Sequence, residues 1–374
     1  MNIKDFNMEL IKKIHLIAKK NQYLTFDEYM NICLYYPDLG YYNNKNISLD
    51  TKNSDFITAP ELTEIYTDSI VTFYLKCKKY KKLENILEFG AGSGKMAYNF
   101  LKNIDHKNLP KKYYIVEKSI YLRNQQKNKL KDLPKKLFDK IEWIEEIKNI
   151  DNIFLISNEV FDALPSKIFY KENNLFYEKI IISKDNKLYF SKKNCENKLK
   201  EEINQIESRI GYKIPNNYTF ELNTSYDKFL SNIYNNINNF VFIIIDYGYS
   251  ENEFYHLERK HGTIQFYKDH KKIKDPFNDQ GNFDISVSVD FSRIRRISEL
   301  YNIKLLGYTT QTQFLLSTNI LDNSSKIKDD FEKNNILKTL LFPTDMGENF
   351  KIMVLCDDIN NKLKIDFKDF RHKL

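Results

Sequence analysis

The spacing of apolar residues predicts a helical beginning to the chain. Between residues 6 and 35, apolar side chains recur at helical spacing, which is typical of two amphipathic helices, with Thr25 placed to cap the second. A third helix is predicted over 61–79, after a loop that ends near Pro60. We therefore expect a helical cap at residues 1–82, whose last loop folds over a ligand site as a lid.

From residue 83 onward, short apolar runs alternate with helical segments. The predicted strands cover 85–89, 113–117, 153–157 and 241–246, and helices are predicted over 95–101 and 119–130. This alternation is typical of βαβ units in a parallel sheet. The run at 241–246 is apolar on both faces, so we expect it near the centre of the sheet. The predicted fold class is α/β, with a Rossmann-like, mostly parallel sheet.

The long gap before residue 241 must hold an insertion. Its pattern predicts a meander of strands followed by two helical stretches, at 167–170, 176–182, 187–190, 196–209 and 225–238. After the central strand, a helix, a strand, two helices and a closing strand are predicted at 290–301, 304–308, 312–319, 325–340 and 350–355. We therefore predict a core at 83–165 and 240–374, and an α+β insertion at 166–239 on the substrate side.

Composition and charge exclude several classes of function. The net charge of +7 is spread over short Lys-rich stretches such as 76–82 and 268–274, which are typical of solvated loops, so no nucleic-acid partner is expected. The four cysteines and six histidines show no metal-ligand spacing, so no metal site is expected. Neither a secretory segment, a transit peptide nor a membrane span is visible, which favours the bacterial cytoplasm over the mitochondrial matrix.

A glycine-rich loop follows the first strand of the predicted sheet. Residues 88–94 read Glu-Phe-Gly-Ala-Gly-Ser-Gly and stand between a strand and a helix, where doubly wound sheets bind their ligands. A P-loop needs four residues between its first glycine and the Gly-Lys pair, but only three follow Gly90, and Met96 follows Lys95. The third small residue of the dinucleotide fingerprint falls on Lys95. Both of these nucleotide-binding motifs therefore fit poorly.

Two acidic residues favour a different nucleoside cofactor. Glu117 ends the second strand, where a carboxylate can accept hydrogen bonds from both ribose hydroxyls. Glu88 is close enough to the loop to bind the ammonium group of a methionine-like tail. Gly90, Gly92 and Gly94 let the backbone approach such a ligand closely. The alternative, that the two acids only cap strand ends, stays open.

Several further segments carry a resemblance to a known family. They are Tyr29–Tyr42, Asp55–Leu62, Val116–Gln126, Asn158–Pro165, Ile245–Gly248, Thr263–Gln265 with His270, Asp284–Phe291, Gln311–Leu315 and Met346–Lys351. In this order they resemble the MidA family, which comprises bacterial proteins and the mitochondrial complex I assembly methyltransferase. The chain departs from the family at Ser54, usually a glycine, and at 90–95, where the family has Gly-Pro-Gly-Arg-Gly-Thr.

The resemblance implies a class I methyltransferase fold with S-adenosyl-L-methionine as the cofactor. It also implies methyl transfer to a protein arginine, which for the mitochondrial members belongs to a complex I subunit. A guanidinium is a cationic and poor nucleophile, so its site should be acidic. We expect Glu159, just past a strand end, to bind the guanidinium, with Asp162 or Asp246 assisting.

Other residues in the matched segments are candidates for cofactor binding. We expect Thr58 and Pro60, in the lid, and Asn158, at a strand end, to contact the cofactor. Structural roles stay open for three of the candidates: Asp162 and Thr58 as helix caps, and Asp246 as a turn former.

Three hypotheses of function remain. The leading one is a protein-arginine methyltransferase with a protein partner, for which the resemblance implies a role in respiratory complex I assembly. The second is methylation of another acceptor, and the third is a non-catalytic assembly factor that keeps the cofactor fold. The sequence leaves the oligomeric state open, a dimer included.

Overall fold

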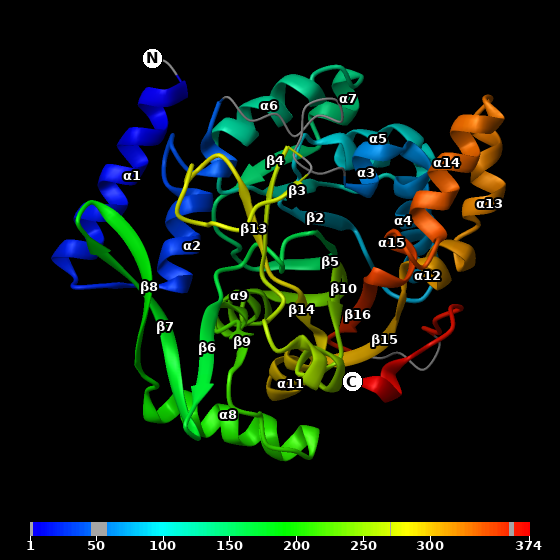
Figure 1. Ribbon diagram of the computed structural model, residues 1–374. Coiled ribbons are helices and arrows are strands. Elements are labelled where there is room, and N and C mark those ends of the chain that lie inside the picture. Colours follow the sequence, from blue (N-terminus) through cyan, green and yellow to red (C-terminus); the bar gives the residue numbers. More distant parts are fainter. Residues whose placement is uncertain (1–2, 46–57, 270, 359–362) are drawn as a thin grey trace.

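The computed structural model describes residues 3–45, 58–269, 271–358 and 363–374, with the largest sheet at the centre (Figure 1). In this part of the chain the sheet has eight strands, in the order β15-β16-β10-β5-β2-β3-β4, with β14 beside the end of β10. The strands are β2 (Asn85–Phe89), β3 (Tyr113–Val116), β4 (Ile141–Ile144), β5 (Ile150–Asn158), β10 (Ile237–Tyr249), β14 (Val289–Asp290), β15 (Lys304–Thr310) and β16 (Phe350–Cys356). Neighbours from β10 to β4 are parallel, whereas β16 is antiparallel to both β10 and β15. The predicted α/β fold with a mostly parallel sheet is confirmed.

Strand β10 lies at the centre of the sheet, as its apolar run predicts. Its residue Ile243 is fully buried and lies opposite Ile156 of β5 on one side and Val354 of β16 on the other. Because β2, β3, β5 and β10 run in the same direction, their carboxyl ends meet at one edge of the sheet. The glycine loop and the acids at 117, 159 and 162 follow these strands, and Asp246 lies near the end of β10.

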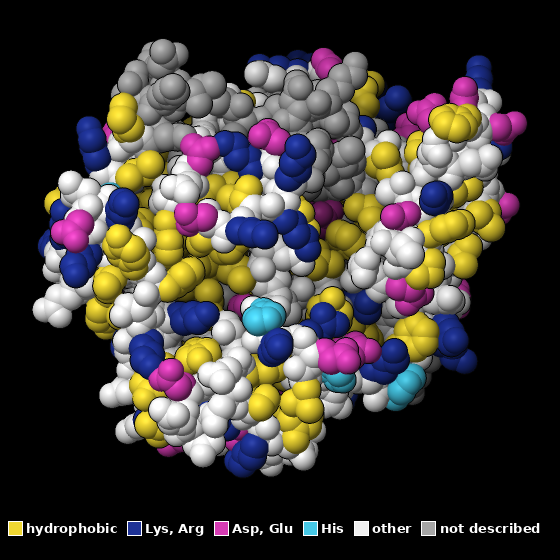
Figure 2. All heavy atoms as spheres, viewed as in Figure 1, with side chains coloured by type: hydrophobic (Ala, Val, Ile, Leu, Met, Phe, Trp, Pro, Cys, Tyr) yellow, Lys and Arg dark blue, Asp and Glu magenta, His cyan; other side chains and the backbone are white. Residues whose placement is uncertain are grey.

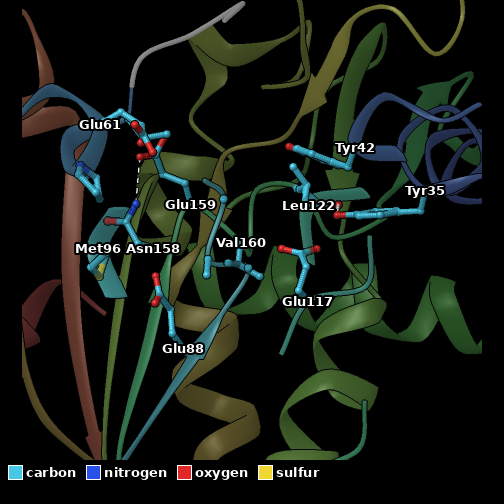
Figure 3. A pocket seen from close by; sticks show the side chains of 16 residues that line it. Tyr35, Tyr42, Glu61, Glu88, Met96, Glu117, Leu122, Asn158, Glu159 and Val160 are labelled. Atoms are coloured by element: carbon cyan, nitrogen blue, oxygen red, sulfur yellow. Dashed lines mark hydrogen bonds between the residues drawn. The ribbon is translucent and has the colours of Figure 1, made fainter. Parts of the chain in front are cut away.

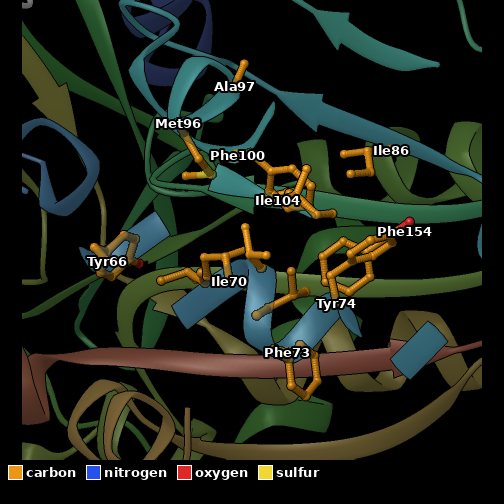
Figure 4. Packing of buried hydrophobic residues seen from close by; sticks show 14 of the residues in the cluster. Tyr66, Ile70, Phe73, Tyr74, Ile86, Met96, Ala97, Phe100, Ile104 and Phe154 are labelled. Atoms are coloured by element: carbon orange, nitrogen blue, oxygen red, sulfur yellow. The ribbon is translucent and has the colours of Figure 1, made fainter. Parts of the chain in front are cut away.

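The side chains of the central strands alternate between two packed faces. Ile86 belongs to the core on one face and Leu87 to the core on the other. The first face is covered by α4 (Glu64–Lys78), α5 (Lys95–Asn103), α12 (Gln311–Ser317) and α14 (Asp330–Leu341), and the second by α9 (Ser225–Tyr234) and α11 (Phe291–Leu300). On the first face, the Tyr74 ring lies 5.5 Å from Phe100 and 5.4 Å from Phe154 (Figure 4). Each large apolar side chain buried in this way contributes about 1.5–3 kcal/mol, so the packing holds the strand ends in place.

The N-terminal helices share a core with the inserted segment. A second sheet has the order β1-β7-β6-β9, with β8 paired to β7. Its strands are β1 (Leu24–Thr25), β6 (Lys167–Glu172), β7 (Leu175–Lys184), β8 (Lys187–Asn194) and β9 (Tyr218–Leu222), and the helices beside it are α1 (Ile3–Lys20), α2 (Phe26–Tyr35) and α8 (Asn197–Ile210). Met30 of α2 packs in one cluster with Ile168, Ile181 and Val287. Figure 1 shows this unit on the side of the molecule away from α12–α14. The domain boundaries at 82, 165 and 239 stay predictions.

A third, small sheet in the described part of the chain follows β10 in the sequence. The strands are β11 (Gln265–Lys268), β12 (Lys271–Lys272) and β13 (Asp284–Ser286), with β11 in the middle. The other elements are η1 (Tyr41–Asn43), α3 (Ala59–Leu62), η2 (His106–Asn108), α6 (Ile120–Leu130), α7 (Lys135–Phe138), α10 (Glu251–Phe254), η3 (Leu257–Arg259), α13 (Ile320–Asn323), η4 (Ser324–Lys326), α15 (Met346–Asn349) and η5 (Arg371–Lys373). None of the described helices is long and apolar enough to cross a membrane.

Several predicted element boundaries are wrong. The helix predicted at 61–79 is two helices, because the chain turns at Thr63, whose φ of −159° is extended and whose hydroxyl accepts the Ile65 N–H at 3.4 Å. The helix predicted at 225–238 ends at Tyr234, and the one predicted at 325–340 begins only at Asp330. Strands β4, β9 and β14 and the third sheet were not predicted.

Candidate active site

The carboxyl ends of β2, β3 and β5 border a cavity that we call the inner cavity (Figure 3). It holds about 770 Å³ of empty space, its mouth included. It is lined by Tyr35, Tyr42, Thr58, Pro60, Glu61, Glu88, Gly90, Ala91, Gly92, Met96, Glu117, Leu122, Asn158, Glu159, Val160 and Ala163. Most of the predicted site residues are therefore brought together here. The exceptions are Gly94, Asp162 and Asp246.

The glycine loop forms the floor of the inner cavity in a conformation that favours glycine. Gly90 and Gly92 have φ values of +60° and +53°, in the left-handed region. A Cβ atom on Gly90 would lie 3.1 Å from Cγ2 of Val160, whereas a Cβ on Gly92 would meet nothing within 4 Å. The backbone at Gly92 is thus open to a ligand. Gly94 instead precedes the first turn of α5 and packs near Gln126.

The lid segment reaches the glycine loop from the other side of the cavity. Thr58 and Pro60 line the cavity, and Thr58 stands at the N-terminus of α3 without a side-chain capping bond. Glu61 accepts a hydrogen bond from the Ser93 hydroxyl, which joins the lid to the loop. Residues 55–57 of the expected lid, and His270, lie outside the described residues.

Glu117 is held at the end of β3 by a network that the sequence did not reveal. Its Oε1 accepts the Ser119 N–H at 3.0 Å, and its Oε2 accepts Nε2 of Gln126 at 3.1 Å. The same Gln126 amide donates to the Gly92 carbonyl at 3.0 Å, and its oxygen accepts the Trp143 indole N–H at 3.0 Å. Burial raises the pKa of Glu117 above its ordinary value, and these hydrogen bonds oppose the rise. The acid and the glycine loop are therefore fixed relative to each other.

Glu88 is a buried carboxyl group on the opposite side of Val160 from Glu117, as Figure 3 shows. The Tyr113 hydroxyl of β3 donates to its Oε2 at 2.7 Å. Burial raises the pKa of Glu88 to about 7, and the hydrogen bond from Tyr113 opposes this shift. Near neutral pH, Glu88 can therefore be charged or neutral according to the ligand beside it.

Glu159 stands where the inner cavity meets a second one. Its backbone has a φ of +54°, which is uncommon for a residue with a side chain, and its N–H donates to the Ile245 carbonyl at 2.9 Å. Asn158 donates its amide to Glu159 Oε1 at 3.1 Å and accepts the Tyr66 hydroxyl at 2.9 Å. Burial, followed by the charge of Asp162, raises the pKa of Glu159 to about 8. Backbone strain and an altered pKa at one residue are typical of functional sites.

Asp246 lies beneath the loop that carries Glu159 and lines neither cavity. Its Oδ2 accepts the backbone N–H groups of Val160, Phe161 and Asp162 at 3.2, 3.0 and 3.3 Å. Its Oδ1 accepts the N–H of Tyr247 at 3.0 Å. Asp246 is fully buried, and burial raises its pKa well above the ordinary value. These hydrogen bonds show that the Asp246 carboxyl group holds the backbone of the 158–165 loop in place.

The second cavity, which we call the outer cavity, holds about 1050 Å³ of empty space, its mouth included. It is lined by Glu159, Asp162, Tyr247, Gly248, Tyr249, Gln265, Tyr267, Lys272, Asp284, Ser286, Ser288, Asp345, Met346, Asn349 and Phe350. Glu159 lines both cavities. Asp162 Oδ1 is buried and has no hydrogen-bond partner in the described part of the chain. Tyr42, from the inner cavity, donates its hydroxyl to Asp284 at 3.1 Å. The inner end of the outer cavity is thus acidic and suits a cation.

Comparison with known proteins identifies the family. A family model described as "Putative S-adenosyl-L-methionine-dependent methyltransferase" matches residues 67–309, which is more than half of the chain. The chain belongs to this methyltransferase family. S-adenosyl-L-methionine is accordingly its cofactor, and the resemblance drawn from the sequence is confirmed.

Relatives of this methyltransferase match along most of its length. A protein arginine methyltransferase NDUFAF7 homolog, mitochondrial, of Caenorhabditis elegans is 26% identical over 89% of this chain and 82% of its own. The protein arginine methyltransferase NDUFAF7, mitochondrial, of Xenopus tropicalis is 25% identical over 90% of this chain and 84% of its own. A crystal structure from Burkholderia thailandensis, bound to S-adenosyl-homocysteine, has a TM-score of 0.91, 24% identity, and covers 100% of this chain and 98% of that one. This likeness confirms the class I methyltransferase fold.

The residues of the inner cavity fit the cofactor of the family. A carboxylate that is fixed at a strand end, a glycine loop with open backbone and a second buried acid are groups that bind a ribose and an amino-acid tail. Tyr35, Tyr42, Met96 and Leu122 also line this cavity, although the sequence predicted none of them as site residues. The available signal for Tyr42 and Leu122 was their place in the matched segments.

Proposed function

We propose that this methyltransferase acts on an arginine side chain of a protein. The observation that carries the proposal is the position of Glu159, whose side chain lines both the cofactor cavity and the acidic outer cavity. Two cavities that meet at one carboxyl group suit a reaction between a bound donor and an acceptor that enters separately. The names of the relatives, protein arginine methyltransferases, support the same acceptor.

In this proposal the inner cavity holds the cofactor along the glycine loop. Glu117 binds the ribose hydroxyls, and Glu88, on the other side of Val160, binds the ammonium of the methionine part. The cofactor is enclosed by Gly90 and Gly92 on the loop side and by Thr58 and Pro60 of the lid. Gly94 sets the start of α5. The cofactor, when bound, would supply a methyl group on a sulfonium: the acceptor nitrogen would attack the methyl carbon opposite the C–S bond, S-adenosyl-homocysteine would leave, and the methylated nitrogen would give up a proton.

The outer cavity holds the guanidinium in the same proposal. Carboxylates beside a guanidinium orient it and draw its positive charge toward the nitrogens they contact. Glu159 is the contact nearest the cofactor cavity, with Asn158 as its support, and Asp162 is the second acid. A carboxyl group with a pKa of about 8 is also a better proton acceptor than an ordinary glutamate. Asp246 is the positioning residue beneath them.

The acceptor that the MidA resemblance favours is a subunit of respiratory complex I, and the proposed location is the bacterial cytoplasm. The test compares the methylarginine content of all proteins, by mass spectrometry, between cells with and without the gene. New methylarginine that depends on the gene supports the proposal, and its position in a complex I subunit supports the acceptor.

A titration of the purified protein with S-adenosyl-L-methionine completes this test. We expect binding by the wild type and by Glu159→Gln, with methylarginine lost only in the variant. Cofactor binding without any methylarginine would instead favour another acceptor or a non-catalytic assembly factor.

A further inference from the structure

The outer cavity does not end at the acidic residues. It shares Tyr249, Gln265, Lys272 and Ser288 with a neighbouring depression of about 620 Å³, its opening included. That depression is also lined by Arg259, Gly262, Thr263, Ile264, Phe266 and Ile273. Because four residues line both, the outer cavity and this depression adjoin and together make a groove that extends from Glu159 past β11 and β12 to Arg259. We call it the acceptor groove.

The acceptor groove is acidic at one end and basic at the other. Glu159, Asp162 and Asp284 line its inner end, and Lys272 and Arg259 line its outer end. Figure 2 shows Lys and Arg side chains gathered at the centre of this face, beside a hollow. The Lys-rich stretch 268–274, which the sequence suggested was merely solvated, thus contributes Lys272 to the groove.

Arg259 is held in a fixed orientation. Its guanidinium carbon lies 3.7 Å from the centre of the Tyr249 ring, and its Nε donates to the Glu253 carbonyl at 2.7 Å. Neither Arg259 nor Lys272 forms an ion pair with a carboxylate of the described residues. A stacked guanidinium with its remaining N–H groups in a groove is preorganised to bind a carboxylate.

We propose that the acceptor groove binds an acidic residue that lies near the target arginine in an extended segment of the acceptor protein. The inference rests on the proposed function. The target guanidinium occupies the acidic end, and an Asp or Glu of the same segment pairs with Arg259 and Lys272. An RNA strand suits the groove less well, because its phosphates would meet Glu159, Asp162 and Asp284 at the inner end.

The test uses the full-length protein saturated with S-adenosyl-homocysteine, so that no turnover occurs. The probes are two fluorescent peptides with one central arginine in a Gly/Ser background. One carries Asp at the third and fourth positions on both sides, and the other carries Asn there. We expect the acidic peptide to bind about tenfold more tightly at low salt, with the preference declining as salt is added.

Three variants and one matched control locate the effect. Lys272→Ala and Arg259→Ala should each reduce the preference for the acidic peptide, measured as the ratio of the dissociation constants of the two peptides. Lys271→Ala is the control, because Lys271 is exposed on the same short strand and does not line the groove. Arg259→Lys should restore only part of the preference, because it keeps the charge and loses the planar fork.

The outcomes separate this inference from the proposed function. Equal binding of the two peptides, no binding of either, or an equal loss in Lys271→Ala overturns the inference. A preference that depends on Arg259 and Lys272, without methylation when S-adenosyl-L-methionine replaces the product, upholds the groove and counts against the arginine acceptor. Methylation of both peptides at the same rate and affinity upholds the acceptor and overturns the groove.

Discussion

The activity of this methyltransferase should depend on pH through Glu159. Its pKa of about 8 in the ligand-free site means that most molecules carry a neutral carboxyl group at pH 7. Only the ionised carboxylate of Glu159 can pair with a guanidinium, so the fraction of molecules able to bind the acceptor is about 9% at pH 7 and about 91% at pH 9. We therefore expect kcat/KM for the acceptor to rise about tenfold from pH 7 to pH 9. The sign follows because an acid with a raised pKa gains its charge only as the pH passes that pKa.

The assay measures S-adenosyl-homocysteine release at saturating cofactor over this pH range. Saturation matters because Glu88, with a pKa of about 7, lies in the cofactor cavity and would add its own pH dependence to cofactor binding. Glu159→Gln should keep cofactor affinity, lose most of the transfer rate and lose the rise with pH. Glu142→Gln, on the exposed part of β4, is the matched control and should follow the wild type.

The raised pKa of Glu159 should also make the stability of the folded protein depend on pH. The folded protein holds the proton of Glu159 more tightly than the unfolded chain, whose glutamate has a pKa of 4.5. Ionisation therefore favours the unfolded chain, and stability is lost as the pH rises from about 4.5 to about 8. Glu159→Gln has no proton to lose, so its Tm should gain on the wild type between pH 5 and pH 8. A wild-type activity profile that is flat from pH 7 to 9, together with an unchanged Tm difference, would refute the reasoning.

Three further substitutions test the cofactor cavity and its support. Glu117→Ala should weaken the binding of S-adenosyl-L-methionine about tenfold to a hundredfold in a calorimetric titration, because it removes a charged acceptor. Methyl transfer should recover at saturating cofactor. An unchanged affinity would count against the ribose contact. Gly92→Ala should lower stability by about 1–2 kcal/mol through its left-handed backbone and also weaken the cofactor, whereas Gly211→Ala, with a φ of +81° and equally open space, should lower only stability. Asp246→Ala leaves three loop N–H groups without their acceptor, so denaturant unfolding should show a loss of about 3 kcal/mol or more, which Asp246→Asn largely avoids.

The sheet was predictable where its strands are long and central. The runs that became β2, β3, β5 and β10 are apolar because both of their faces are covered. Strand β4 is short and lies at the sheet edge with Glu142 exposed, so it lacks a continuous apolar run. The predicted helix over 225–238 ran too far because Ile233 and Ile237 are four positions apart, which satisfies a helical period although β10 begins at Ile237.

The candidate site was predictable only as far as strand ends could indicate it. Parallel strands share one edge, so Glu117, Asn158 and Glu159 could be expected near the glycine loop. The local sequence does not determine the direction in which a side chain at a strand end points. Asp246 faces the underside of a loop from another strand, and Gln126 reaches the acid from the following helix. The outer cavity combines residues from 159 to 350, and no local pattern joins them.

The core that α1 and α2 share with the insertion has a consequence for synthesis of the chain. Met30 packs with Ile181 and Val287, so this cluster is complete only after all three have been made. At about 5–20 residues per second, the roughly 250 residues between Met30 and Val287 take about 12–50 s to emerge. During that interval the apolar faces of the first two helices lack part of their native core. The nascent chain therefore exposes apolar surface that the folded protein buries, and slower synthesis lengthens that exposure.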